Sequence, residues 1–290
     1  MPIISPTRDI PDVEDWVTEI GKAGRLLHQM GAAEGAAGNI SVFLPESTPG
    51  ARGFCLARFP RDEAYSFPGG VRLPPGVLLI TGSGRRLRDV LEYPEQSMCA
   101  VVIDASGASW LHRPNKSLVE PTSEIDSHVG IYSAALGGYP RLYSVVHAQP
   151  PKTTFLSHLP KYQQTERFNR QLLRWQPETI VALPNGVTVL PYATPGTPDQ
   201  GQQTTAALLR GKIAVWARHG VIAHSEKGPM AAVDLIEYLE SAATFELLDM
   251  QTGRSTAGFS IEELRAICER FETPASLLAT LPDDLLGAPS

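Results

Sequence analysis

Short apolar runs recur along almost the whole chain, each rich in β-branched residues and bounded by glycine, proline or asparagine. Runs of this composition are typical of buried strands. Each of them needs neighbouring strands to satisfy its backbone groups, so this pattern constrains the fold more than any other feature of the sequence. The predicted strands cover residues 40–43, 77–81, 99–103, 143–147, 180–183 and 213–217.

Stretches with helical spacing separate the predicted strands. In the first of them, Trp16, Ile20 and Leu27 recur on one face. The last opens with Ser260 as N-cap and Glu263 three residues later, which is the pattern of a capping box. The predicted helices cover residues 12–30, 123–135, 199–209, 230–250 and 261–271. Strands interleaved with helices indicate an α/β protein in which helices cover a sheet.

The long segment at residues 45–75 is rich in proline and glycine. We expect a surface excursion there rather than a linker between domains, because strands resume directly after it. The chain has 290 residues, of which 42% are apolar, and this is enough material for one large core. The order of the motifs described below favours a single domain.

The overall charge argues against some classes of partner. With a formal net charge of −6, the chain lacks the basic surface that nucleic acids and anionic membranes attract. No stretch approaches the roughly 20 apolar residues of a membrane helix, and the N-terminus does not resemble a signal peptide. Cys55, Cys99 and Cys268 are odd in number and widely spaced, which indicates reduced thiols rather than disulfides or a metal site. These features favour a cytoplasmic protein.

Small polar residues form three turn-like segments, Gly38-Asn39-Ile40-Ser41, Thr81-Gly82-Ser83-Gly84 and Pro121-Thr122-Ser123-Glu124. Turns of this kind expose backbone N–H groups, and asparagine and serine side chains add donors, which suits a phosphate. Thr122 and Ser123 also lie at a predicted helix start, where the helix dipole favours an anion. Each segment taken alone is more often an ordinary turn than a phosphate site.

Two histidines stand at the ends of predicted strands. His147 ends the run Ser144-Val-Val-His, and His219 follows the run that begins at Val215. If these strands are neighbours, the two imidazoles can converge on one metal ion, because neutral imidazole is a common zinc ligand. The alternative is a pair of unrelated polar residues at strand ends.

The order of the motifs resembles one known family. The segments GNIS, ITGSG, PTSE, VVH, VLPYATPGT and RHGVIAH follow one another as they do in the class II aldolase/adducin superfamily. Within it, the long segment before ITGSG and the run PETIVALPNGVTVLPYATPGT are similar to the bacterial rhamnulose-1-phosphate aldolase branch. The resemblance covers roughly residues 12 to 275.

The resemblance implies a single-domain, layered α/β/α fold at residues 12–275, with a central, mainly antiparallel β-sheet and with tails at 1–11 and 276–290. It implies a lyase that cleaves a phosphorylated sugar, a ketose 1-phosphate, into dihydroxyacetone phosphate and an aldehyde. The implied cofactor is Zn²⁺ or another divalent ion, and the implied assembly is a homotetramer.

The resemblance also assigns roles to individual residues. Glu124 matches the family's proton-shuttling glutamate, and His147 and His219 match two of its three zinc-binding histidines. Glu178 matches a glutamate that a neighbouring subunit offers to the aldehyde oxygen. The residues that match the substrate-phosphate site are Asn39, Ser83, Gly84, Thr122 and Ser123.

The sequence departs from the family at the first metal pair, where His-x-His is replaced by His147-Ala148-Gln149. An amide oxygen is a neutral and usually weaker zinc ligand than imidazole. Three outcomes are therefore open: Gln149 binds the metal in a changed geometry, His128 or His224 replaces it, or metal and aldolase activity are lost. Another sugar-phosphate lyase, dehydratase or epimerase on the same fold, or a non-catalytic adducin-like binding protein, are the alternatives.

Overall fold

A nine-stranded sheet forms the centre of the protein, in the order β2-β5-β4-β3-β1-β6-β9-β8-β7. The computed structural model describes residues 12–114, 118–137, 143–254, 256–273 and 278. The strands are β1 (Asn39–Pro45), β2 (Arg61–Tyr65), β3 (Gly76–Thr81), β4 (Met98–Ile103), β5 (Ser109–Arg113), β6 (Tyr143–Ala148), β7 (Thr188–Leu190), β8 (Ile213–Trp216) and β9 (Gly220–Ser225). The pair β7 and β8 is parallel, and the other neighbouring pairs are antiparallel. This confirms the predicted fold class.

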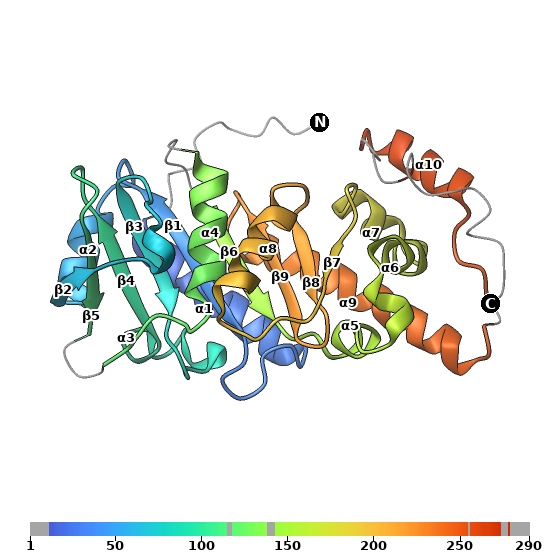
Figure 1. Cartoon of the computed structure of the whole chain (residues 1–290), viewed down its shortest axis with the longest axis horizontal. Helices are drawn as coiled ribbons and strands as arrows, with labels where there is room; N and C mark the ends of the chain where they lie inside the picture. The colour runs from blue at the N-terminus through green and yellow to red at the C-terminus, as the bar shows by residue number, and fades with distance from the viewer. Residues whose placement is uncertain (1–11, 115–117, 138–142, 255, 274–277, 279–290) are drawn as a thin grey trace, which may run out of the picture.

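Helices cover both faces of the sheet (Figure 1). Helices α1, α2 and α9 contribute to one buried apolar cluster, and α4 and α8 contribute to a second cluster on the other face. The helices are α1 (Val13–Gln29), α2 (Ala51–Arg58), α3 (Pro94–Ser97), α4 (Ile125–Leu136), α5 (Pro151–Leu156), α6 (Thr165–Leu172), α7 (Pro177–Ala182), α8 (Pro198–Leu208), α9 (Pro229–Gln251) and α10 (Ile261–Arg270). Among the described residues, no helix has both the length and the apolar character needed to cross a membrane.

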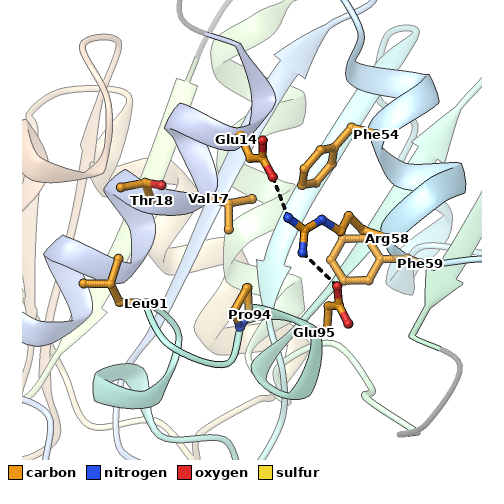
Figure 2. A pocket seen from close by; sticks show the side chains of 9 residues that line it. All are labelled: Glu14, Val17, Thr18, Phe54, Arg58, Phe59, Leu91, Pro94 and Glu95. Atoms are coloured by element: carbon orange, nitrogen blue, oxygen red, sulfur yellow. Dashed lines mark hydrogen bonds and ion pairs between the residues drawn. The ribbon is translucent and has the colours of Figure 1, made fainter.

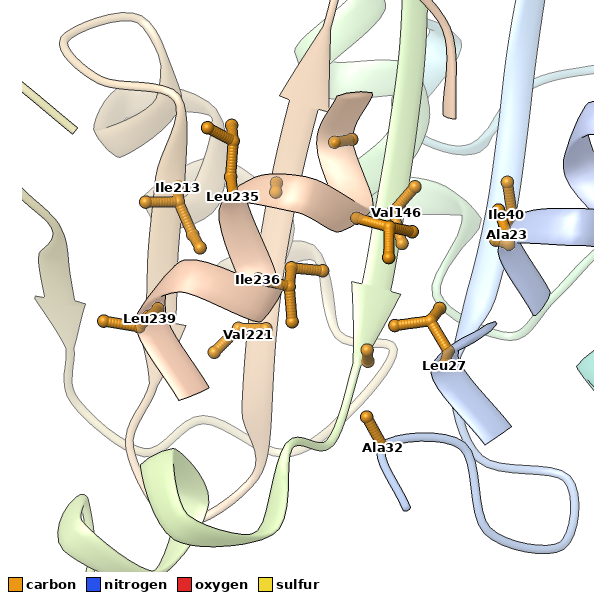
Figure 3. Close-up of a cluster of buried hydrophobic side chains, with 14 of the residues drawn as sticks. Ala23, Leu27, Ala32, Ile40, Val146, Ile213, Val221, Leu235, Ile236 and Leu239 are labelled. Atoms are coloured by element: carbon orange, nitrogen blue, oxygen red, sulfur yellow. The ribbon is translucent and has the colours of Figure 1, made fainter. Parts of the chain in front are cut away.

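The two clusters follow from the alternation of side chains along each strand. In β1, Ile40 and Val42 belong to the larger cluster, whereas Phe43 belongs to the smaller one. Figure 3 shows the larger cluster, in which Leu27 of α1 and Ile236 of α9 lie against strand residues of the sheet. A shift of one residue in any central strand would exchange these faces, so the apolar pattern fixes the register.

The predicted helix starts agree with the structure. The Asp12 side chain accepts a hydrogen bond from the Asp15 backbone and so caps α1, and Ser260 caps α10 through the predicted capping box with Glu263. The predicted single domain at residues 12–275 stays a prediction. The predicted tails, 1–11 and 276–290, lie outside the described residues except for Leu278.

The segment at residues 45–75 differs from the expected surface excursion. It contains α2 and β2, and it buries Cys55, Phe59 and Phe67. Arg58, the last residue of α2, donates hydrogen bonds to Glu14 of α1 and to Glu95 of α3, and Figure 2 shows it between the two carboxylates. The glycines and prolines flank these elements. Their high frequency in this segment suggested a loop, although the segment contains the helix α2, which packs on the sheet.

The run at residues 180–183 was predicted as a strand and is wrong in type, because it lies in α7 and the turn that follows it. A four-residue apolar run cannot be distinguished from a buried helical turn by periodicity alone. Pro177 at the first helical position favours the helix. The predicted buried, reduced state of the cysteines is confirmed, since Cys55, Cys99 and Cys268 are all free and buried.

Glu240 links α9 to the segment that follows β6. Its buried carboxylate accepts hydrogen bonds from the backbone N–H groups of Lys152 and Thr153 and from the Thr153 hydroxyl, each at 2.9 Å. These donors lie in the first turn of α5, which has no side-chain cap of its own. Glu240 therefore fixes the direction in which the chain leaves β6.

We predict that Glu240→Ala lowers the free energy of unfolding by about 2–4 kcal/mol, because two buried donors and one partly buried donor lose their acceptor. The measurement is urea unfolding followed by circular dichroism. Glu237→Ala is the matched control, since Glu237 is exposed on the same helix and should change stability by no more than about 0.5 kcal/mol. Equal stabilities of the two variants would contradict the role given to Glu240.

Candidate metal and catalytic site

Polar residues from three strands lie on the face of the sheet that α4 and α8 cover. Asn39 begins β1, His147 lies near the end of β6, and Trp216 ends β8. Asn39 and His147 are directly paired in the register of β1 and β6. Side chains at paired positions project from the same face, so the antiparallel pairing brings these two side chains together. Both are at least 95% buried, with exposed fractions of 5% and 1%.

Glu124 joins them from the start of α4, where it is the N-cap residue. Its Oε2 accepts a hydrogen bond of 2.8 Å from Asn39 and lies 3.4 Å from Nε2 of His147. Its Oε1 lies 3.5 Å from Nε2 of His219 and is buried without a hydrogen-bond partner. The ligand atoms that Glu124, His147 and His219 offer all lie within 4.8 Å of one another.

The backbone holds His147 in a ligand-like orientation. Its Nδ1 donates a hydrogen bond of 2.8 Å to the Val221 carbonyl of β9. A neutral imidazole that donates through one nitrogen presents a lone pair on the other. The second nitrogen, Nε2, faces Glu124 and would offer this lone pair to a metal ion; carbonyl-oriented histidines of this kind are common in metal sites.

His219 lies in the turn between β8 and β9, where its N–H bonds to the Trp216 carbonyl at 2.9 Å. Gln200 of α8 contacts Nδ1 of His219 at 3.3 Å, and this leaves Nε2 facing Glu124. The preceding residue, Arg218, has a positive φ of 64°, and its N–H donates to the Ser157 hydroxyl at 2.8 Å. The helix α5 that follows β6 thus also supports the turn that carries His219.

Trp216 forms an apolar wall beside both imidazoles. Its ring centroid lies 4.6 Å from that of His147 and 5.1 Å from that of His219, and it is stacked on the latter. Its indole N–H donates to the Thr204 hydroxyl of α8 at 2.8 Å. Sequence patterns do not indicate Trp216 or Gln200, because neither belongs to a motif. Their contacts depend on how α8 packs.

Burial and neighbouring groups set the charge of the cluster. Burial raises the pKa of Glu124, but His147, the Asn39 hydrogen bond and His219 lower it by more, so the pKa falls below its usual value. Burial lowers the pKa of His219 to about 4, with a further contribution from His147. At neutral pH the site therefore combines an ionised carboxylate with a neutral His219, and a divalent cation accepts both as ligands.

The structure bears on the open question of a replacement ligand. His128 has both ring nitrogens occupied, by Ser41 at 2.6 Å and by Asn39 at 2.5 Å. His224 contacts the Tyr143 hydroxyl through Nδ1 at 2.6 Å and backbone carbonyls through Nε2. Neither ring offers a free nitrogen to the cluster.

Gln149 lies just beyond β6 and is partly buried. Its backbone N–H donates to the Ala32 carbonyl at 2.7 Å, and its side chain runs beside Gly220. The third donor group next to the two imidazoles comes from Glu124. A carboxylate with two histidines is itself a known zinc-binding set, so the residues present fit a divalent ion.

Four of the residues expected at a phosphate site lie in two adjacent turns, and the fifth, Asn39, begins β1. Ser83 and Gly84 are exposed after β3, and Ser123 is exposed immediately before Glu124. The turns are joined by the Ser83 N–H, which donates to the Glu120 carbonyl at 2.8 Å, and by the Thr122 N–H, which donates to the Thr81 carbonyl at 3.2 Å. Exposed donors and the start of α4 therefore lie beside the buried cluster.

Glu178 lies apart from these contacts. It is exposed in the first turn of α7, a helix that packs against α9 and α10. Within the described part of the chain, no hydrogen bond or ion pair connects it to Glu124, His147 or His219.

Two glycines are required where backbones meet at the cluster. A Cβ on Gly220 would lie 2.5 Å from the Ala148 carbonyl oxygen and 3.1 Å from Cε1 of His147. Gly38 has a φ of 81°, and a Cβ there would lie 2.9 Å from the His147 carbonyl oxygen. The glycines of the Gly-Asn and His-Gly motifs thus permit β1, β6 and β9 to converge around His147.

We predict that Gly220→Ala lowers the free energy of unfolding by about 1–3 kcal/mol, because the added methyl group collides with backbone. The measurement is chemical unfolding, with Gly211→Ala as control. A Cβ on Gly211 would have its nearest neighbour at 3.7 Å, so that variant should remain within about 1 kcal/mol of the parent protein. A Gly220→Ala protein as stable as the control would contradict the close approach.

Comparisons with known proteins identify the family of the chain. Residues 18–247 match the family model of the Class II Aldolase and Adducin N-terminal domain. The chain is similar to the rhamnulose-1-phosphate aldolase of Listeria innocua, with 28% identity over 274 residues, which cover 93% of this chain and 97% of the relative. It is also similar to the rhamnulose-1-phosphate aldolase of Pectobacterium carotovorum, with 30% identity over 220 residues, or 73% and 77% of the two chains.

The fold comparison gives the same result. The solved structure of a sugar-phosphate aldolase from Thermotoga maritima superposes with a TM-score of 0.70 at 26% identity, and covers 84% of this chain and 99% of that one. Because the family model spans most of the sequence and the fold agrees with it, the chain belongs to the class II aldolase and adducin family, and its matching relatives are carbon–carbon lyases of the aldolase type.

Proposed function

We propose that the protein is a divalent-metal-dependent aldolase that cleaves a ketose 1-phosphate, of the rhamnulose-1-phosphate kind, into dihydroxyacetone phosphate and an aldehyde. The observation that carries the proposal is the buried group of Glu124, His147 and His219, whose ligand atoms lie within 4.8 Å of one another. The aldolase relatives that match over most of the chain support it.

The metal ligands in this proposal are His147 and His219, with Glu124 and Gln149 as the adjacent donors. Zinc fits two imidazoles and a carboxylate, and Gln149 would add a neutral oxygen. A bound divalent ion acts as a Lewis acid that polarises the substrate carbonyl and stabilises negative charge formed when the carbon–carbon bond breaks.

Glu124 acts as the proton carrier. Cleavage breaks the bond between C3 and C4 of the ketose, and the electron pair of that bond stays with C3. In the condensation direction the Glu124 carboxylate removes a proton from C3. In the cleavage direction Glu124 first takes up a proton from solvent and then delivers it to C3. Support comes from Oε1, which is buried, has no hydrogen-bond partner and faces His219.

The substrate phosphate binds at the two turns beside the cluster. Ser83, Gly84 and Ser123 supply exposed donors, and the start of α4 adds its dipole. Thr122 and Asn39, which are both buried, complete the proposed phosphate site. Binding energy from this non-reacting group positions the carbonyl at the cluster.

We predict that the protein loaded with zinc or another divalent ion releases aldehyde from ketose 1-phosphates, and that chelation abolishes this activity. Rhamnulose 1-phosphate, fuculose 1-phosphate and an unphosphorylated ketose form the substrate series, with isomerisation and dehydration scored in the same samples. No aldehyde from any phosphorylated ketose by the metal-loaded protein would overturn the proposal.

Two variants connect this activity to the cluster. Glu124→Gln should lower kcat by about 10²–10⁴-fold because it removes the proton carrier. His147→Ala should lower the bound metal measured by elemental analysis, whereas His158→Ala, outside the cluster, should leave it unchanged. Normal turnover of the first variant, or normal metal content of the second, would remove the residue from its proposed role.

We further propose that the protein is a homo-oligomer, a tetramer by family resemblance, in which Glu178 of one chain serves the active site of its neighbour. In support, Glu178 is exposed, and among the described residues no hydrogen bond or ion pair joins it to the cluster of its own chain. A carboxyl group supplied there would exchange the proton of the substrate oxygen at C4, which becomes the aldehyde oxygen.

The expected result is complementation. Glu124→Gln and Glu178→Gln proteins are each weakly active, and mixing them with subunit exchange restores part of the activity, because some sites then hold both native carboxylates. Exchange is verified by mass spectrometry of differently labelled chains. Complete exchange without recovery, or a monomeric active protein, would exclude the shared site.

A further inference from the structure

We propose that His128 is a positioning residue that fixes which end of the Asn39 amide faces Glu124. The proposed role of His128 is at the active site of the proposed function, so the effect of His128 on turnover rests on that function. The inference comes from an uninterrupted row of hydrogen bonds that begins at Glu124 and ends inside the layer between α4 and the sheet.

The row contains five side chains. Asn39 Nδ2 lies 2.8 Å from Glu124 Oε2, and Asn39 Oδ1 lies 2.5 Å from Nε2 of His128. The other ring nitrogen of His128, Nδ1, lies 2.6 Å from the Ser41 hydroxyl. The Ser41 hydroxyl in turn lies 2.7 Å from the Tyr132 hydroxyl.

The direction of every bond in the row follows from its two ends. The Glu124 carboxylate only accepts, so Asn39 must turn its NH₂ group toward it and its carbonyl toward His128. His128 must then donate through Nε2, and in its neutral form it accepts at Nδ1. The Ser41 hydroxyl therefore donates to His128 and accepts from Tyr132.

The environment of the row supports this single direction. His128, Ser41 and Tyr132 have no exposed surface. Burial lowers the pKa of His128 to about 3, so the ring is neutral at physiological pH, as the direction requires. Tyr132 also receives a hydrogen bond from the Val145 backbone, which leaves its own proton for Ser41.

The consequence for Glu124 is that its two oxygens are not equivalent. Oε2 is anchored by Asn39, while Oε1 has no hydrogen-bond partner and is turned toward His219. If the Asn39 amide rotated by half a turn, its carbonyl oxygen would face the carboxylate and lose the bond. His128 opposes this rotation because its Nε2–H donates to the Asn39 carbonyl oxygen and would otherwise face the NH₂ group, which offers no acceptor.

The first test does not depend on activity. Nuclear magnetic resonance of protein with ¹⁵N-labelled histidine reports the tautomer of each ring, and the His128 signals are those missing from His128→Gln. We expect a neutral ring protonated at Nε2 at pH 7. A ring protonated at Nδ1, or at both nitrogens, would overturn the proposal even if the protein proves to have no aldolase activity.

The second test uses a matched pair of variants in the metal-loaded enzyme. His128→Leu removes the donor to Asn39, whereas His128→Gln keeps an N–H at a comparable distance along the side chain. We expect His128→Leu to lower kcat by about 10–100-fold with little change in KM, and His128→Gln to retain most of the parent kcat. Equal losses in both variants would contradict a role through the donated hydrogen bond.

A double-mutant cycle separates positioning from general loss of structure. In the Asn39→Ala background, His128→Leu should have no further effect on kcat, because the residue through which it acts is gone. Additive losses would overturn the proposal. If the parent enzyme cleaves no ketose phosphate, the proposed function fails, and the tautomer measurement alone decides the role of His128.

Discussion

The pairing of β1 with β6, and of β6 with β9, is the constraint on which the rest of the site depends. It places Asn39 opposite His147 and brings the Val221 carbonyl to the His147 ring. Each central strand alternates between the two apolar clusters, so a slip of one residue would turn His147 and Asn39 into the opposite layer. The buried aliphatic side chains therefore fix the position of the polar ones, and Gly38 and Gly220 give the strands room to meet there.

Helix α4 adds the second half of the site through its own periodicity. Glu124 at its N-cap and His128 one turn later project toward the same region of β1, where Asn39 and Ser41 are two residues apart. Residues four apart on a helix and residues two apart on a strand each lie on one face of their element, so these two pairs can face each other. This match connects a carboxylate at the helix end, through Asn39, to a fully buried imidazole.

The sequence predicted the parts of this site that local patterns encode. Gly-Asn, Pro-Thr-Ser-Glu and the two histidines at strand ends were recognisable because turn chemistry and strand composition are local. Trp216, Gln200 and the polar row through His128 were not, because each depends on packing between segments far apart in the chain. The strand expected at 180–183 was wrong for a related reason: a short apolar run encodes burial, and Pro177 with the packing of α7 on α9 decided its conformation.

The family resemblance places a third imidazole where this chain has Gln149, and a neutral amide carries the same formal charge as a neutral imidazole. Among the described residues, Glu124 is the only anionic donor in the metal-ligand group that it forms with His147 and His219. In our proposal the same carboxylate also transfers the substrate proton. One oxygen atom cannot bind the cation and transfer the proton at the same time. Oε1 and Oε2 have different surroundings, so the two roles can be divided between them. Asn39 holds Oε2 by a hydrogen bond, and Oε1 remains available for the cation or the proton. If Glu124 binds the cation as we propose, the residues that hold Asn39 in place act on metal affinity through the orientation of this carboxylate.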